Sequence, residues 1–337
     1  MKAMELRDWN VDSIVLAERP KPAPGPGQVL IKMRAASLNF RDTVMAKRGY
    51  GRRSGNLPLV LVSDGAGTVE AIGAGVARVK VGDLVCPAFS QTWPSGTFSE
   101  ASWLGTLGGP LDGTMQEYMC LSEQGVVKAP AHMSAAEAAT LPCAALTAWN
   151  AVVEQGKTQA GDMVLIQGTG GVSLFALIFA KMHGAETILI SSSDEKLARA
   201  KPLGADHCIN YKTAPDWGKA ARDIAGGRGV DHVVEVGGAG TLERSIRAVR
   251  PSGVISLIGV LAGGLGELNL GPVVTQNIRL QGITVGSRDL FEAMNRALAL
   301  HKVKPPIDEH RFAFDGLKDA LNAFPAGQHF GKVVCEF

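Results

Sequence analysis

Four polar side chains lie close together after an apolar segment, and three of them could stabilise a developing negative charge. The stretch "SLNFRD", residues 37–42, follows "GQVLIKMRAA" and contains Asn39, Arg41 and Asp42, and Tyr50 lies in the next loop. Amide, guanidinium and phenol groups can donate hydrogen bonds to an oxygen that gains charge, and a phenol can also donate a proton. We therefore interpret Asn39, Arg41 and Tyr50 as candidate catalytic residues.

Each of these residues also has a structural interpretation. Asn39 could satisfy the backbone of its own loop. Arg41 and Asp42 could form an ion pair, or the Asp42 carboxylate could hold a cofactor. Tyr50 could pack against a loop. The sequence leaves these alternatives open.

A second stretch, "MVLIQGTGGVSLFALIFAK", has the pattern of a strand, a glycine-rich turn and a helix in direct succession. Glycines permit a sharp turn and a close approach of the backbone, and the amides at a helix start attract a pyrophosphate. Ser173 stands in place of the last glycine of the usual G-x-G-x-x-G pattern and is still small. The flanking elements and the next strand, "TILIS", favour a dinucleotide site over a merely tight turn. The expected cofactor-binding residues are Gly168, Thr169, Gly170, Gly171 and Val172.

The end of the next strand indicates which dinucleotide binds. About twenty residues after the glycines, NAD-binding proteins carry an Asp or Glu for the ribose hydroxyls, whereas this chain has "ISSSDEK". Hydroxyl groups and a lysine suit the 2′-phosphate of NADP, so that we favour NADP over NAD and assign Ser191, Ser192, Ser193 and Lys196 to this site. In the alternative, Ser192 and Glu195 only cap the next helix, and Asp194 is the residue that binds the ribose hydroxyls of NAD.

These stretches belong to two kinds of sequence. Up to about Pro130, short β-like runs alternate with glycine and aspartate turns, which indicates a compact barrel-like β domain. A helix is predicted from Ser134, with Glu137 completing a capping box, and is interrupted at Pro142. Apolar strands then alternate with helices to about Val285, which is typical of a parallel sheet covered on both faces. The tail is rich in helix and ends in a strand that could return to the first domain.

Composition limits the classes of partner. With 337 residues, of which 46% are hydrophobic and 20% charged, the chain predicts two domains with sizeable cores. The 34 basic and 32 acidic residues give a net charge of +2, so that we expect no nucleic acid as a partner. The sequence contains no apolar run that could cross a membrane and no secretory signal, which predicts a cytoplasmic protein. We expect a small-molecule substrate as its partner.

The order of these features resembles the medium-chain dehydrogenase/reductase superfamily, and most closely its zinc-independent, quinone-oxidoreductase-like members. The resemblance covers nearly the whole chain and rests on a series of stretches in order, among them "GPGQVLIKMRAASLNFRD", "LVSDGAGTVEAIGAGV", "AATLPCAALTAWNA", "GTGGVSLFALIFAK", "LGADHCINY" and "HFGKVV". It implies an α/β protein with a GroES-like, β-barrel-type catalytic domain in residues 1–133 and 286–337. It also implies a Rossmann domain with a doubly wound parallel sheet in residues 134–285, and commonly a homodimer.

The resemblance further implies that no zinc is bound. In the zinc-dependent alcohol dehydrogenases of this superfamily, a catalytic cysteine stands at the position of Asn39. A Gly-His-Glu motif stands where this chain has Val62, Ser63 and Asp64. Only Cys143 remains near the third ligand position, and the cysteine-rich lobe for a structural zinc is missing. Because zinc needs three or four thiolate, imidazole or carboxylate ligands, one cysteine and one aspartate do not form a site.

The family pattern also implies further cofactor contacts. Asp42 is expected to hold the cofactor, Thr147 to line the nicotinamide pocket, and Lys332 to reach the pyrophosphate. Tyr211 is expected beside the adenine ribose or the 2′-phosphate. At the remaining positions the backbone is expected to approach the cofactor, and glycines suit such contact; these positions are Val236, Gly237, Gly259, Val260, Val285, Gly286, Ser287, Phe330 and Gly331.

Together these observations predict a zinc-independent, NADP(H)-dependent oxidoreductase, with NAD(H) as the alternative cofactor. Simple alcohol oxidation is disfavoured, because a metal normally stabilises the alkoxide. Hydride addition to a quinone or an α,β-unsaturated carbonyl compound needs only hydrogen-bond donors for the charged oxygen. Two alternatives stay open: a zinc-independent alcohol or aldehyde dehydrogenase of the same fold, and an NADP-binding protein with little catalysis, such as a redox sensor or structural protein.

Overall fold

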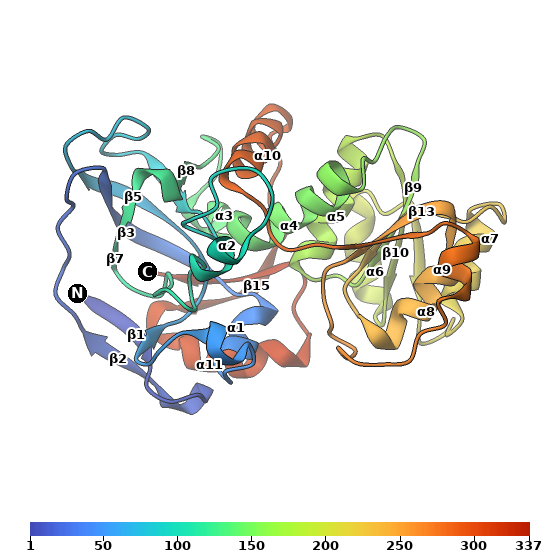
Figure 1. Cartoon of the computed structure of the whole chain (residues 1–337), viewed down its shortest axis with the longest axis horizontal. Coiled ribbons are helices and arrows are strands. Elements are labelled where there is room, and N and C mark those ends of the chain that lie inside the picture. The colour runs from blue at the N-terminus through green and yellow to red at the C-terminus, as the bar shows by residue number, and fades with distance from the viewer. The chain divides into compact units, whose positions relative to one another are not determined.

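The computed structural model describes residues 1–337 and divides into two compact units (Figure 1). The first unit comprises Met1–Leu146 and Val285–Phe337, and the second comprises Thr147–Thr284. Helices and strands occur in both, and the predicted α/β class is confirmed. None of the helices combines the length and the apolar character that a bilayer crossing requires.

The first unit is built on a seven-stranded sheet. Its order is β15-β16-β3-β5-β6-β8, with β7 paired to β3. The strands are β3 (Gln28–Ser37), β5 (Asp64–Ile72), β6 (Leu84–Pro87), β7 (Tyr118–Ser122), β8 (Val126–Lys128), β15 (Ile307–Ala313) and β16 (Lys332–Glu336). A smaller sheet of order β2-β1-β4 is formed by β1 (Lys2–Leu6), β2 (Ile14–Glu18) and β4 (Leu59–Val60). The predicted β-rich, GroES-like domain is therefore confirmed.

The last strand of the chain returns to the first unit, as predicted. β16 pairs antiparallel with β3, and Val334 lies opposite Ser37. Because the two strands run in opposite directions, the start of β16 lies beside the end of β3. Lys332 is thereby brought next to the segment that carries Asn39.

Five α-helices belong to the first unit: α1 (Phe40–Met45), α2 (Glu100–Leu104), α3 (Ala135–Ala138), α10 (Arg288–His301) and α11 (Leu317–Ala323). The predicted capping box of Ser134 and Glu137 opens α3. Pro142 lies in a π-helical turn, Leu141–Ala145, so that the predicted interruption is present too. Because α3 packs on β3, β5 and β16, the boundary between the units falls between Leu146 and Thr147 rather than at residues 133 and 134.

The second unit contains a six-stranded parallel sheet of order β11-β10-β9-β12-β13-β14. Its strands are β9 (Met163–Gln167), β10 (Glu186–Ser191), β11 (His207–Asn210), β12 (Val230–Glu235), β13 (Val249–Leu257) and β14 (Arg279–Gly282). The helices around it are α5 (Gly171–Met182), α6 (Asp194–Ala200), α7 (Trp217–Ile224), α8 (Ala239–Ala248) and α9 (Gly271–Thr275). The short α4 (Leu146–Trp149) precedes a second π-helical turn, Asn150–Gln155.

Helices bury both faces of this parallel sheet. Leu165 and Ile188 share one hydrophobic cluster with Trp217 of α7 and Ile246 of α8. Successive side chains of a strand point to opposite faces, and Ile166, next to Leu165, is also fully buried. That second face is available to α5, which packs on β9 and β10. The predicted doubly wound Rossmann arrangement is therefore confirmed.

Candidate active site and cofactor-binding loops

The first group of predicted site residues lies where β3 ends and α1 begins. Asn39 is the N-cap of α1, and its backbone N–H donates to Asp42 Oδ2 over 2.8 Å. Asp42 is fully buried, and burial raises its pKa to about 6 against the opposing charge of Arg41. With one oxygen capping the helix and no exposed surface, Asp42 fits the structural interpretation better than a cofactor contact.

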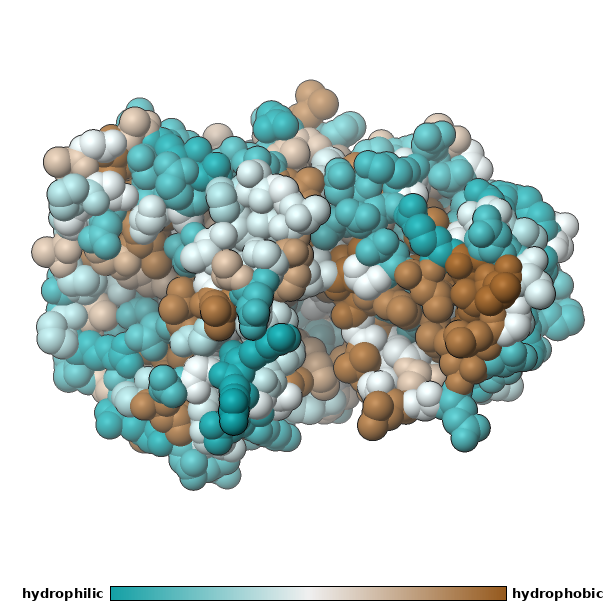
Figure 2. All heavy atoms as spheres, viewed as in Figure 1, coloured by the Kyte–Doolittle hydropathy of each residue, from teal (hydrophilic) through white to brown (hydrophobic).

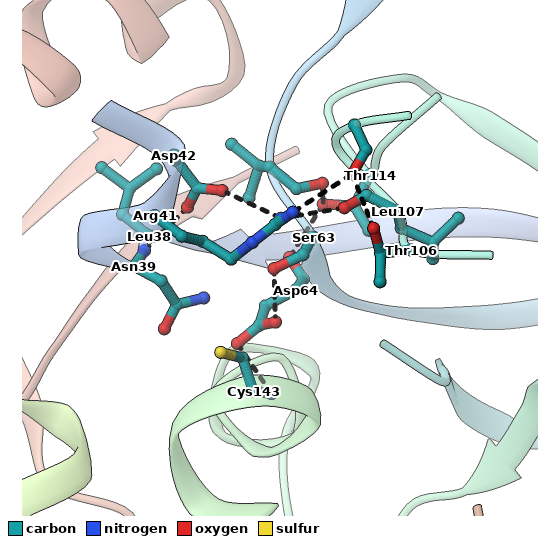
Figure 3. Close-up of polar contacts among 12 residues, drawn as sticks. Leu38, Asn39, Arg41, Asp42, Ser63, Asp64, Thr106, Leu107, Thr114 and Cys143 are labelled. Atoms are coloured by element: carbon teal, nitrogen blue, oxygen red, sulfur yellow. Dashed lines mark hydrogen bonds and ion pairs between the residues drawn. The ribbon is translucent and has the colours of Figure 1, made fainter. Parts of the chain in front are cut away.

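Arg41 is held by backbone carbonyl groups of a neighbouring loop (Figure 3). Its guanidinium donates to Leu107 O over 2.9 Å and to Gly109 O over 3.2 Å. It also lies 3.9 Å from Asp42 Oδ1 and over the ring of Phe89. These contacts fit the structural interpretation of Arg41, and they leave its positive charge within the cluster.

Tyr50 is half-buried, and its ring packs edge-on against Trp103 with the centroids 5.3 Å apart. Burial raises the pKa of the phenol, while Arg41 acts in the opposite direction. The phenol is therefore protonated at neutral pH and can donate a proton. Cys143 and Asp42 also act on its pKa, so that Tyr50 belongs to the same cluster.

A second group of side chains comes from the start of β5 and from the π-helical turn. Ser63 Oγ donates to Asp64 Oδ1 over 2.9 Å, and the Cys143 N–H donates to Asp64 Oδ2 over 3.2 Å. Ser63 and Asp64 are fully buried. Val62 has a φ of 71°, which strains a β-branched residue. A backbone conformation suited to glycine is thus kept at the position where the zinc-dependent enzymes have one.

Lys332 joins the two groups. Its side chain is only 2% exposed, and Nζ donates to Leu38 O and to Asn39 Oδ1, each over 2.6 Å. Nζ also lies 3.5 Å from Asp64 Oδ2. Lys332 was expected at a pyrophosphate, and the structure gives it these internal partners instead. Residue spacing could not reveal them, because Lys332 and Asn39 are 293 positions apart.

The residues of this cluster do not fit a zinc ion. The groups at the expected ligand positions are the Asn39 amide, the Ser63 hydroxyl and the Cys143 thiol. Burial, and then the charge of Asp64, raise the pKa of Cys143 to about 12, which disfavours the thiolate form. Zinc binds thiolate, imidazole and carboxylate groups, and no group of three or more His, Cys, Asp or Glu side chains is arranged to hold a metal.

In the second unit, the glycine loop has a geometry that suits a pyrophosphate. Gly168 directly follows β9, and its φ of 79° favours glycine. α5 begins at Gly171, and the N-cap Gly170 has no side chain to occupy the first amides of the helix. Ser173, which replaces the third glycine, donates its hydroxyl to Gln167 O over 2.6 Å. The replacement therefore ties the helix to the strand.

A buried carboxylate joins this loop to the next glycine turn. Glu235, the last residue of β12, accepts hydrogen bonds from the N–H groups of Gly237 over 2.7 Å and Gly238 over 3.0 Å. Gln167 Nε2 donates to the other carboxylate oxygen over 2.6 Å. The sequence pattern predicts a site role for Gly237 but not for Glu235 or Gln167. Polar residues at the ends of the apolar strands "MVLIQ" and "VDHVVE" were the available signal.

Three serines follow one another at the carboxyl end of β10. Ser191 is buried, Ser192 is half-buried, and Ser193 is the N-cap of α6. The Ser193 hydroxyl accepts from the Lys196 N–H over 3.3 Å. The alternative cap by Ser192 and Glu195 is therefore wrong, because Ser193 takes that role.

Two more residues border the same strand end. Asp194 accepts a hydrogen bond from Asn210 Nδ2 over 2.9 Å. The Tyr211 N–H donates to Ser191 O over 3.1 Å, and the Tyr211 side chain is partly exposed. The edge thus presents hydroxyl groups and an aromatic ring, as expected around an adenosine 2′-phosphate, together with one partnered carboxylate.

The other predicted cofactor residues are divided between the units. Thr147, Thr169, Val172, Val236, Gly259 and Val260 lie in the second unit, and Val285, Gly286, Ser287, Phe330 and Gly331 lie in the first. Close packing explains two glycines, since a Cβ at Gly259 would lie 2.5 Å from Val236 O and one at Gly331 would lie 2.1 Å from Pro306 O. Ser287 caps α10 with its hydroxyl, so that it also has a local structural role.

Comparisons with known proteins relate both units to dehydrogenases. The family model "Alcohol dehydrogenase GroES-like domain" matches residues 25–131, and "Zinc-binding dehydrogenase" matches residues 171–300. A zinc-type alcohol dehydrogenase-like protein of Schizosaccharomyces pombe is 42% identical over 315 residues, 92% of this chain and 90% of that protein. A 2-haloacrylate reductase of a Burkholderia species is 32% identical over 267 residues, 78% of this chain and 74% of that protein.

Solved structures show the same architecture over the full chain. A Sinorhizobium meliloti protein described as an alcohol dehydrogenase superposes with a TM-score of 0.93 at 42% identity, covering 100% of this chain and 98% of that one. An NAD-dependent alcohol dehydrogenase gives 0.91 at 33% identity, with 100% of both chains covered. A 2-octenoyl-CoA carboxylase reductase in complex with NADP and 2-octenoyl-CoA gives 0.87 at 25% identity, covering 99% and 87%.

Proposed function

Since the chain belongs to the medium-chain dehydrogenase/reductase superfamily, we propose that it is a zinc-independent, NADPH-dependent oxidoreductase that transfers hydride to a conjugated carbonyl acceptor. The acceptor is a quinone or an α,β-unsaturated carbonyl compound. One observation carries the proposal: at the positions of the metal ligands, this chain has an amide, a hydroxyl and a neutral thiol, with the Lys332 ammonium 3.5 Å from Asp64.

The side chains of the first unit suit an acceptor of this kind. An alcohol must lose a proton before it gives up hydride, and a metal normally stabilises that alkoxide. A conjugated acceptor instead spreads the incoming charge onto its oxygen, where hydrogen-bond donors can hold it. Asn39 supplies an amide for the oxygen. Tyr50, whose phenol is protonated at neutral pH, supplies the proton that completes the reduction.

The second unit supplies residues that would hold NADPH, which provides the hydride when it is bound. The first amides of α5 would bind the pyrophosphate, as the bare N-cap Gly170 allows. Ser191, Ser192 and Lys196 would bind the 2′-phosphate, because hydroxyl and ammonium groups attract it. The relative solved in complex with NADP supports this choice, whereas the NAD-dependent relative supports the alternative cofactor.

Two relatives support the conjugated acceptor by the activities that their names state. A 2-haloacrylate and a 2-octenoyl thioester both carry a carbon–carbon double bond next to a carbonyl group. The alcohol dehydrogenase names of other relatives favour a second candidate, an alcohol or aldehyde oxidoreductase of the same fold. In that case a side chain would have to replace the Lewis acid.

A single assay separates these functions. Purified protein of measured zinc content is mixed with NADPH, and the absorbance of the reduced nicotinamide is followed with 9,10-phenanthrenequinone, cyclohex-2-en-1-one or benzaldehyde. Turnover of the quinone or the enone in zinc-free protein is the expected result. Turnover of benzaldehyde alone would support the second candidate. Tight NADPH binding without any turnover would support a binding protein.

We also propose a homodimer formed through the second unit. β14 is an edge strand, and five large apolar side chains in the segment between β13 and β14 are exposed; these are Val260, Leu261, Leu265, Leu270 and Val274. Figure 2 shows hydrophobic side chains gathered on the face that carries α9. Such a patch is typical of an interface. In sedimentation velocity, Val274→Asp should yield monomers. The control Leu300→Asp, at an exposed site of the first unit, should remain a dimer. A dimeric Val274→Asp variant would contradict the proposal.

A further inference from the structure

We propose that Lys332 is a positioning residue of the active site: its ammonium fixes the Asn39 carboxamide so that Asn39 Nδ2 donates a hydrogen bond to the carbonyl oxygen of the acceptor. The inference rests on the proposed function, because it assigns an atom to the oxygen that gains charge on hydride addition. Through the Asn39 amide, the buried Lys332 thereby helps to stabilise the oxygen that gains charge, which is a role that a metal cation has in the zinc-dependent enzymes.

Stability alone does not account for a lysine at this position. Removing an ammonium from water costs several kcal/mol, and a buried ion pair can often be replaced by apolar residues without loss of stability. Lys332 has one charged partner, Asp64, at 3.5 Å. Its two shortest contacts, of 2.6 Å each, are to neutral oxygens of Leu38 and Asn39. The ammonium is therefore directed at the loop that carries Asn39 more closely than at its counter-ion.

Lys332 determines which end of the Asn39 carboxamide is free. An ammonium group has donors and no acceptor, so that it can bond only the carbonyl end of an amide. Asn39 Oδ1 accepts that bond, and Nδ2 must point elsewhere. Asn39 Nδ2 is buried and has no hydrogen-bond partner in the structure.

A buried N–H group without a partner calls for an explanation. Such groups are rare in folded proteins, and each costs about 1–3 kcal/mol. An acceptor atom from outside the chain would satisfy this one. Figure 3 shows the Asn39 side chain beside Asp64 and Cys143. Asn39 and Cys143 stand at or near positions that correspond to metal ligands in the zinc-dependent enzymes. A carbonyl oxygen bound there would accept a hydrogen bond from the Asn39 amide instead of binding to a metal.

The surrounding charges favour this donor. A hydrogen bond from an ammonium to Oδ1 polarises the carboxamide and strengthens its N–H groups as donors. Asp64 balances the charge of Lys332, and its oxygens accept from Ser63 Oγ and the Cys143 N–H but not from Asn39 Nδ2. The donor is therefore held in place before the substrate arrives, which is the arrangement that stabilises a developing oxyanion.

The test is a double-mutant cycle between Lys332 and Asn39. Lys332→Met is made together with Asp64→Asn, so that no buried carboxylate is left unpaired, and Asp64→Asn alone is the control. With cyclohex-2-en-1-one as acceptor, Lys332→Met/Asp64→Asn and Asn39→Ala should each lower kcat about 100-fold. Because the two residues act as one unit, the combined variant should be no slower than Asn39→Ala. The Kd for NADPH should stay within about twofold.

Two outcomes of this cycle would overturn the inference. Losses in kcat that multiply in the combined variant would show that Lys332 does not act through Asn39. A rise in the Kd for NADPH of about tenfold or more with kcat retained would assign Lys332 to the pyrophosphate instead. Thermal unfolding of each variant shows whether it is folded.

A second measurement tests the inference even if the wild-type protein reduces no acceptor. That outcome would contradict the proposed function but not the inference. Asparagine is labelled with 15N, and the Asn39 side-chain signal is identified by its loss in Asn39→Ala. Cyclohex-2-en-1-one added to the NADP⁺-loaded protein should shift this signal. In Lys332→Met/Asp64→Asn the two N–H resonances should collapse towards those of a freely rotating amide. An Asn39 signal that responds to neither change would overturn the inference.

Discussion

Gln167 and Glu235 meet at the carboxyl ends of the neighbouring strands β9 and β12, where both are buried and Gln167 Nε2 donates to Glu235 Oε2 over 2.6 Å. Both side chains also accept from the Gly237 N–H, Glu235 over 2.7 Å and Gln167 over 3.3 Å. Gln167 ends the strand before the first glycine loop, and Glu235 ends the strand before the second. One buried polar pair therefore holds together two loops that are assigned to the cofactor.

This pair predicts a loss of both stability and cofactor affinity when Glu235 is removed. Glu235→Ala leaves several buried donors without an acceptor, so that the free energy of unfolding should fall by about 3 kcal/mol. The Kd for NADPH should rise about tenfold as the loops lose their common anchor. Urea denaturation and calorimetric titration measure the two effects. Glu267→Ala, at an exposed site of the same unit, should change neither, and an unaltered NADPH affinity in Glu235→Ala would refute the anchoring role.

The serines after β10 predict a cofactor preference that one substitution reverses. Ser192→Asp places a carboxylate where the 2′-phosphate is expected, and the repulsion should raise KM for NADPH about tenfold or more. KM for NADH should change little or improve. Asp194→Asn is the matched control, because Asp194 is already bonded to Asn210, and should leave the preference for NADPH unchanged. A wild-type protein that prefers NADH would contradict the assignment of the three serines.

Tyr50 is predicted to donate the proton that follows hydride transfer. Tyr50→Phe keeps the edge-on packing against Trp103 but removes the hydroxyl, so that kcat should fall about 100-fold with the unfolding midpoint nearly unchanged. Stopped-flow measurement of nicotinamide oxidation with an enone gives kcat. Trp103→Phe, which alters the packing partner and keeps the phenol, should reduce kcat much less. Full turnover by Tyr50→Phe would remove Tyr50 from the mechanism.

Much of the fold follows from local sequence patterns. The apolar run, glycines and second apolar run of residues 163–182 specify β9, the turn and α5 without help from the rest of the chain. The capping box at Ser134 is local in the same way. The boundary between the units is different, because it depends on the packing of α3 against β3 and β5. No short stretch of sequence records that contact.

The candidate site was predictable in its members and less so in their roles. Asn39 and Arg41 are found together because one stretch of sequence carries both. The partners of Lys332 depend on the register between β16 and β3, which is set by strand pairing across almost the whole chain. Side-chain exposure matters equally: Lys332 is suited to a pyrophosphate by charge alone, yet it is 2% exposed and bonded within the first unit.

Stability of the second unit should fall in acid because of His232. This side chain is 2% exposed, and burial, followed by the charge of Arg279, lowers its pKa from 6.5 to about 4. Between these values the unfolded chain binds a proton that the folded chain does not, so the free energy of unfolding should drop as the pH falls from about 6.5 to 4, by about 3 kcal/mol in total. Denaturant titrations at several pH values measure the slope. His232→Gln should reduce the slope of the free energy of unfolding against pH, whereas His301→Gln, at an exposed site, should not. An equal slope in the wild type and in His232→Gln would show that another group governs the acid response.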